Sequence, residues 1–71
     1  MNLKVNGSEK SFNFKGSNPN LLVIVRELKL NPKLIVIEYN GAILNQEMWE
    51  AQIVKDGDNL EIVTIVGGGS Y

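Results

Sequence analysis

Two stretches near the start of the chain alternate between hydrophobic and polar residues. Leu3 and Val5 have polar neighbours, and Phe12 and Phe14 repeat this spacing after an interruption at Gly7-Ser8. Strict alternation is typical of strands with one buried face, and a glycine-containing turn between two such runs is typical of a hairpin. The pattern therefore predicts an antiparallel hairpin whose second strand contains the two phenylalanines.

The next hydrophobic residues follow a helical period. Asn18 is suited to the N-cap and Pro19 to the first position, so a helix is expected from Pro19 to about Lys29. Its apolar stripe consists of Leu21, Val25 and Leu28, widened by Leu22 and Ile24. Asn31-Pro32 is expected to prevent any continuation, because the residue before proline disfavours the helical region.

The second half of the chain predicts strands joined by tight turns. Leu34–Ile37 is continuously apolar, which predicts a central strand buried on both faces. Asn40-Gly41 is a hairpin turn signal, and Ala42–Leu44 is the expected return strand. The segment Asn45–Glu50 predicts one helical or 3₁₀ turn that carries Met48 and Trp49 inward.

The final strand is expected to lie in the middle of the sheet. It follows the turn residues Lys55–Asp58 and runs over Asn59–Val66, which is too apolar for an exposed edge. The order of elements predicts an α+β roll of the β-grasp (ubiquitin-like) type, with one main helix on a mixed four- or five-stranded sheet. We expect one β-grasp domain over residues 1–66 and a flexible, glycine-rich tail over residues 67–71.

Composition limits the chemistry that this chain performs by itself. It has no cysteine and no histidine, which removes thiolate catalysis, the commonest general base and the commonest metal ligands. Asp56 and Asp58 flank one glycine and fall far short of a calcium loop. We therefore expect no catalytic residue, no metal site and no bound cofactor.

Charge and hydropathy narrow the expected partners. A net charge of -1 gives no basic surplus that would attract nucleic acid or an anionic membrane. The apolar runs are far shorter than the roughly 20 residues that span a bilayer, and the first residues do not resemble a signal peptide. A cytoplasmic protein that binds neither nucleic acid nor membrane is expected.

The chain ends in a glycine run, Gly67-Gly68-Gly69, followed by Ser70-Tyr71. Glycine has no Cβ, so such a run can lie flat in a channel that is too narrow for side chains. The alternative is an ordinary frayed terminus, since chain ends are commonly disordered. From the run alone, both remain open: Gly67, Gly68 and Gly69 either enter a narrow channel of another protein or form a frayed end.

Several short motifs in this order resemble one family. They are Val5-Asn6-Gly7, Val36 to Gly41, Trp49, Lys55 to Asp58, and Glu61 to Gly69. Together they cover nearly the whole chain and resemble the ThiS-type sulfur carriers, which are ubiquitin-like proteins of thiamine biosynthesis. The small subunit of molybdopterin synthase is a related carrier, but it tends to have aromatic and proline residues before its glycines, which Thr64-Ile65-Val66 lacks.

The resemblance implies that the chain is a protein substrate and not an enzyme. A ThiF-like adenylating enzyme would use ATP to activate the carboxylate of Gly69, with Gly68 as the second choice. A sulfur donor would then give a thiocarboxylate, and a thiazole synthase or another acceptor would receive the sulfur. A carrier for methionine, cysteine or molybdopterin synthesis, and a ubiquitin-like modifier without sulfur chemistry, remain alternatives.

Ser70-Tyr71 departs from the family pattern, because members generally end at the glycines. With these residues attached, Gly69 is held in an amide and has no free carboxylate. We expect a metalloprotease to cut between Gly69 and Ser70, as short extensions are removed from some related carriers. The rival explanations are an artefact of the sequence and a carrier that never charges.

Four apolar residues are candidates for a partner-binding patch. They are Ile43, Leu44, Ile65 and Val66. Ubiquitin-like proteins commonly dock through a sheet face, and the resemblance implies the same here. Packing in the core is the alternative role for these residues.

Overall fold

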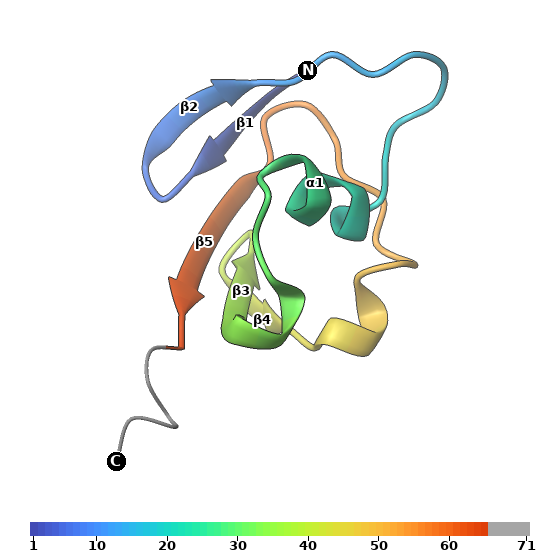
Figure 1. Ribbon diagram of the computed structural model, residues 1–71. Coiled ribbons are helices and arrows are strands. Elements are labelled where there is room, and N and C mark those ends of the chain that lie inside the picture. Colours follow the sequence, from blue (N-terminus) through green and yellow to red (C-terminus); the bar gives the residue numbers. More distant parts are fainter. Residues whose placement is uncertain (66–71) are drawn as a thin grey trace.

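A computed structural model describes residues 1–65. The elements, in chain order, are β1 (Asn2–Val5), β2 (Ser8–Ser11), α1 (Leu21–Glu27), a 3₁₀ turn (Pro32–Leu34), β3 (Ile35–Tyr39), β4 (Ala42–Leu44), a second 3₁₀ turn (Gln46–Met48) and β5 (Asn59–Thr64). The sheet order is β2-β1-β5-β3-β4, with β1 parallel to β5 and the other neighbours antiparallel (Figure 1). The predicted fold, a β-grasp roll with a five-stranded mixed sheet, is confirmed.

The first hairpin forms as expected, but its second strand lies earlier than predicted. Asn6 and Gly7 both have positive φ, 52° and 82°, as a two-residue type I′ turn requires. That turn places Val5 opposite Ser8, so β2 begins at once. The prediction of a strand through Phe12 and Phe14 was wrong, because this register pairs Ser11 with Asn2, where β1 begins, and β1 offers no partner to the residues after Phe12.

The helix begins two residues later than predicted. Asn20, not Asn18, is the N-cap, and its side chain accepts a 2.9 Å hydrogen bond from the Val23 amide. Pro19 accepts a bond of 2.9 Å from the Val54 amide, and Asn20 forms an isolated bridge with Ile53. This extended contact holds Pro19 outside the helix, so local propensity yields to a tertiary pairing.

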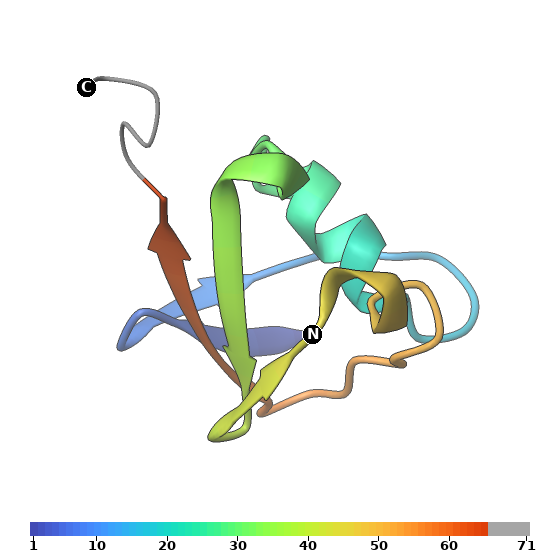
Figure 2. The same ribbon diagram turned by 90° about the horizontal axis from the view of Figure 1, so that it is seen from below.

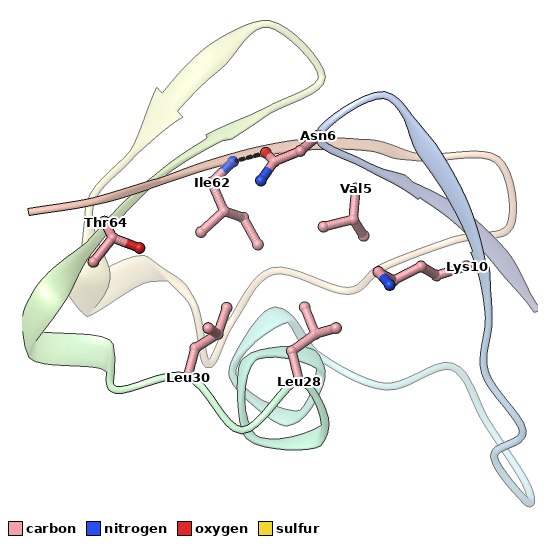
Figure 3. Close-up of a pocket in the computed structure, with 7 residues that line it drawn as sticks. All are labelled: Val5, Asn6, Lys10, Leu28, Leu30, Ile62 and Thr64. Atoms are coloured by element: carbon pink, nitrogen blue, oxygen red, sulfur yellow. Dashed lines mark hydrogen bonds between the residues drawn. The ribbon is translucent and has the colours of Figure 1, made fainter.

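The helix ends in a left-handed turn that redirects the chain. Lys29 has φ 59°, and its amide donates to the Arg26 carbonyl at 2.9 Å. The Leu30 amide donates to the Val25 carbonyl at 3.2 Å, which completes a Schellman motif. This turn places Leu28 and Leu30 side by side at the end of α1, near β5 (Figure 3).

The core lies between the sheet and α1, and the opposite face of the sheet is uncovered (Figure 2). The buried hydrophobic residues are Leu3, Val5, Leu21, Ile24, Val25, Ile35, Ile37, Trp49, Val54 and Leu60. In β3 the burial alternates, with Ile35 and Ile37 buried and Val36 exposed. The prediction that β3 is buried on both faces was wrong, because the one α-helix of residues 1–65 covers a single face.

The middle position of β5 is confirmed, since it pairs with β1 on one side and β3 on the other. The predicted helical turn after β4 is a 3₁₀ turn, but it carries only one of its two large side chains inward. Trp49 is 1% exposed and donates from Nε1 to the Leu44 carbonyl at 2.9 Å, whereas Met48 is half exposed.

A polar cluster ties the turn after β3 to the turn before β5. The Tyr39 hydroxyl donates to the Asp58 carboxylate, which also accepts from the Lys55 amide at 2.8 Å and from Asn40 Nδ2 at 3.2 Å. Burial alone would raise the pKa of Asp58, but these hydrogen bonds lower it. Burial, reinforced by the bond to Asp58 and its charge, raises the pKa of Tyr39 to about 12.

The Tyr39 hydroxyl should make stability depend on alkaline pH. Its pKa is raised from 10.0 to about 12 on folding, so its contribution is complete below pH 10 and is lost as the pH rises toward 12. Tyr39→Phe should lower the free energy of unfolding by about 1 kcal/mol at pH 7. Urea unfolding of both proteins between pH 7 and 11.5 measures the difference, which should shrink above pH 10. Parallel curves would contradict this role for Tyr39.

Candidate functional site

The uncovered side of the sheet carries an exposed apolar surface, here called the apolar face: Val36, Ile43, Val63 and Ile65. Ile43 is 67% exposed and Val63 is 62% exposed. Val36 and Val63 lie directly opposite each other in the β3–β5 ladder. The Ile65 amide donates to the Leu34 carbonyl at 2.6 Å, which continues this ladder, so Ile65 follows Val63 on the same side. The apolar face therefore spans three neighbouring strands and the point where β5 ends.

Two glutamates lie within the same surface. Glu38 of β3 is directly opposite Glu61 of β5, and Ile43 of β4 is opposite Glu38 on its other side. Like charges in directly opposite positions destabilise a sheet. A basic group on a partner would offset this repulsion, so the apolar face favours a partner surface that combines apolar and basic side chains.

The structure separates the four residues of the predicted patch. Ile43 and Ile65 belong to the apolar face, but Leu44 is partly buried and packs against the core. Adjacent residues of a strand point to opposite sides, so Ile43 and Leu44 could not share one surface. Val66 lies outside the described residues. Partner binding by Ile43 and Ile65 stays a prediction.

Sequence reasoning missed two members of the apolar face, Val36 and Val63. Val36 lies in the continuous apolar run that was interpreted as a strand buried on both faces, and Val63 lies in the last strand, which was predicted only to be in the middle of the sheet. The signal that would have found them is the number of helices. One helix covers one face of a sheet, so every second residue of the interior strands must be exposed.

The predicted reactive and processing residues, Gly67, Gly68, Gly69 and Ser70, lie outside the described residues. The structure does fix where they start, because Ile65 is tied to the Leu34 carbonyl at the end of β5. Four residues from Ile65 to Gly69 span at most about 14 Å, at about 3.3–3.6 Å per residue. An enzyme that acted on Gly69 would therefore lie within about 14 Å of Ile65, at the end of β5.

The acidic turn between residues 55 and 58 is occupied by internal hydrogen bonds. Asp56 Oδ1 accepts from the Asn2 amide at 2.6 Å, and Asp58 accepts from Lys55 and Asn40. Among residues 1–65, no group of three or more His, Cys, Asp or Glu side chains is placed to hold a metal ion. Within that same range, no helix has the length and hydrophobicity needed to cross a bilayer.

The comparisons with known proteins agree with this architecture. A family model described as the ThiS family matches residues 3–69. The chain belongs to the ThiS family. The matched stretch contains every described strand beyond Asn2 and ends at Gly69, so it confirms the resemblance inferred from the sequence motifs.

Structures from the ThiS family share the fold throughout. The crystal structure of the thiamine biosynthesis protein (ThiS) from Geobacter metallireducens is 34% identical, with a TM-score of 0.82 over 97% of this chain and 100% of that one. The solution structure of a thiamine biosynthesis protein from the same organism gives a TM-score of 0.79, also at 34% identity, and covers 97% of this chain and 88% of the other.

Similar sequences include proteins of two kinds. The protein ycf40 of Trieres chinensis is 38% identical over 92% of this chain and 85% of its own length. A thiazole synthase of Paramagnetospirillum magneticum is 33% identical over 99% of this chain, which corresponds to 21% of that longer protein.

Proposed function

We propose that this chain is a sulfur-carrier protein that supplies sulfur for the thiazole of thiamine. The observation that carries the proposal is the family match, which extends through the folded domain to Gly69. The names of the similar structures, thiamine biosynthesis proteins, support the same pathway. The similarity to part of a thiazole synthase favours thiazole formation over molybdopterin, methionine or cysteine synthesis as the destination of the sulfur.

In the proposed reaction the carrier is a substrate and supplies only its C-terminal carboxylate. An oxygen of the Gly69 carboxylate attacks the α-phosphorus of ATP, pyrophosphate leaves, and an acyl adenylate forms. Hydrosulfide, delivered by a sulfur donor, then attacks the acyl carbon and AMP leaves, which gives a thiocarboxylate and releases one proton. ATP and the active-site groups belong to the partner enzyme, and the cytoplasm is the proposed site of action.

The proposed first partner is a ThiF-like adenylating enzyme that covers the apolar face. The short distance from Ile65 to Gly69 requires this enzyme to contact the end of β5. Burial of Ile43, Val63 and Ile65 would supply hydrophobic free energy at about 25 cal/mol per Å². The Glu38–Glu61 pair would select a partner with basic residues at the matching positions.

The residues after Gly69 are proposed to be removed before charging. While Ser70-Tyr71 is attached, the Gly69 carbonyl is part of a peptide bond and offers no carboxylate to ATP. A peptidase, which we propose is a metalloprotease, would hydrolyse the Gly69–Ser70 bond. The end of the family match at residue 69 supports this position for the cut.

The intact mass of the protein isolated from its own cells tests the function directly. We expect a species that ends at Gly69, part of which carries sulfur in place of one carboxylate oxygen. Cells that lack the adenylating enzyme are the matched control and should contain only the carboxylate form. A protein that always retains Ser70-Tyr71, or one joined through Gly69 to a lysine of another protein, would contradict the sulfur-carrier role.

A further inference from the structure

The edge of β5 that faces β1 is only partly covered. β1 pairs with β5 as far as Val5, which lies opposite Leu60, and the chain then turns away at Asn6. The Asn6 amide donates to the Leu60 carbonyl at 2.8 Å, and Asn6 Oδ1 accepts from the Ile62 amide at 2.6 Å. The Asn6 side chain thus takes the place of a backbone acceptor for the Ile62 amide. Beyond Ile62, β1 supplies no hydrogen-bond partner to β5.

The next residue on this edge is Thr64. In an antiparallel ladder, pairs that exchange hydrogen bonds alternate with pairs that do not. Because Ile65 bonds to Leu34 across the β3 side, Thr64 must direct its own N–H and C=O to the opposite side, toward the place that β1 has left. No backbone group of residues 1–65 is paired with Thr64 there. Thr64 therefore forms a short free edge on β5, a strand in the middle of the sheet.

A pocket of about 290 Å³ opens beside this free edge, on the helix side of the sheet. Figure 3 shows Leu28 and Leu30 pointing from the end of α1 toward Ile62 and Val5, with Thr64 at one end and Lys10 at the other. The floor of the pocket is apolar, and the polar residues Asn6, Lys10 and Thr64 form its rim. A strand laid along the edge would direct every second side chain into this pocket, as strand geometry requires.

The charge of Lys10 limits which kind of peptide segment could lie in this pocket. Lys10 lies opposite Leu3 in the β1–β2 hairpin, so it projects to the helix side, and Figure 3 shows its amino group directed toward the pocket. An extended segment with one apolar side chain and a neighbouring carboxylate would match both the floor and this ammonium group.

The position of the tail indicates which protein supplies the segment. Thr64 closes the pocket and is the residue before Ile65, where the path to Gly69 begins. A protein that holds Gly69 in its active site must lie against this end of β5, within about 14 Å of Ile65. The free edge and the apolar face are then two sides of one interface.

We propose that an extended segment of the adenylating enzyme adds to the sheet as a strand beside β5. It pairs with the N–H and C=O of Thr64, places an apolar side chain among Leu28, Leu30 and Ile62, and places a carboxylate beside Lys10. Strand addition of this kind derives affinity from main-chain hydrogen bonds and specificity from alternate side chains. The inference rests on the proposed function and adds the mode of recognition to it.

Thr64→Pro tests the main-chain pairing. Proline removes the outward N–H, which the sheet itself does not use, so an edge position tolerates it. Thr64→Val is the matched control, because it keeps the N–H and a β-branched shape. With the purified ThiF-type enzyme of the same organism, Thr64→Pro should raise the Kd about tenfold, whereas Thr64→Val, which keeps the paired N–H, should change it by less than about twofold. Calorimetry on the full chain and on the chain that ends at Gly69 measures both values.

Lys10→Glu tests the pocket without touching the backbone or the core. It should raise the Kd about fivefold, and the difference should shrink with added salt. Lys15→Glu makes the same change of charge in the segment between β2 and α1 and should have no effect. Amide exchange of labelled protein supplies a direct readout, because the Thr64 amide should become protected in the complex.

The outcomes separate this inference from the proposed function. If the wild-type chain binds and is charged, but Thr64 gains no protection and both Thr64→Pro and Lys10→Glu bind normally, strand addition is excluded and the carrier function stands. If Thr64→Pro fails to fold, the Kd of Lys10→Glu and the exchange rate of the Thr64 amide in the wild-type complex still test strand addition. If neither form of the wild-type chain binds the enzyme, the proposed function fails and this inference fails with it.

Discussion

A chain that ends at Gly69 is expected to be adenylated by the ThiF-type enzyme, while the chain that retains Ser70-Tyr71 gives no detectable charging. The reason is chemical, because only the shorter chain has a carboxylate at Gly69. ATP–pyrophosphate exchange measures the first half-reaction for both chains. Equal exchange with the two chains would contradict Gly69 as the acceptor.

Two variants of the shorter chain distinguish the chemistry from docking. Gly69→Val places a β-branched side chain at the acyl carbon and should lower kcat/KM by about a hundredfold or more, as misplacement at a reacting centre does. Val63→Glu adds a third carboxylate to the apolar face, beside Glu61. It should raise KM about tenfold with little change in kcat, because it weakens docking alone. A Val63→Glu protein with unchanged KM would remove the apolar face from the interface.

The elements that were predicted correctly are those that the residues of one short segment indicate by themselves. Asn40-Gly41 gives two consecutive residues with positive φ, 51° and 90°, and the hairpin that it predicts is present. The strongly apolar composition of β5 predicted its place in the middle of the sheet, and the pairing confirms it. For the hairpin, two neighbouring residues determine the outcome; for β5, the composition of one strand indicates a position that its pairing with β1 and β3 produces.

The wrong predictions concern elements whose bounds or burial depend on contacts with segments far away in the sequence. Pro19 is a good first residue for a helix, but its carbonyl is paired with the Val54 amide, and the helix starts after it. The apolar run in β3 was interpreted as buried on both faces, which requires a second covering layer that residues 1–65 do not supply. The number of helices available to cover the sheet should therefore have been weighed above apolar composition for this strand.

The apolar face, which is proposed to bind the partner, was predictable only in outline. The sequence pointed to Ile43 and Ile65, and the structure adds Val36, Val63 and the Glu38–Glu61 pair through the β3–β5 register. The pocket beside Thr64 had no sequence signal at all. It exists because β1 leaves β5 early and the turn after α1 brings leucines to the gap, and both depend on tertiary geometry.

Trp49→Ala is expected to be the most destabilising single change in the folded part of the chain. The side chain is 1% exposed and lies in the segment between β4 and β5, where it packs against the core. Truncating a buried tryptophan costs about 3–5 kcal/mol. A domain of this size is stable by only about 4–10 kcal/mol, so the variant should be close to unfolding at 37 °C.

Trp49→Phe is the matched control, because it keeps most of the apolar volume and removes the 2.9 Å bond from Nε1 to the Leu44 carbonyl. Thermal unfolding followed by circular dichroism should show a Tm lowered by about 5 °C for Trp49→Phe and by about 15 °C or more for Trp49→Ala. Where Trp49→Ala is still folded, its charging at Gly69 should retain the wild-type kcat, because Trp49 supports the fold and not the tail. A Trp49→Ala protein as stable as the wild type would show that the segment between β4 and β5 contributes little to the core.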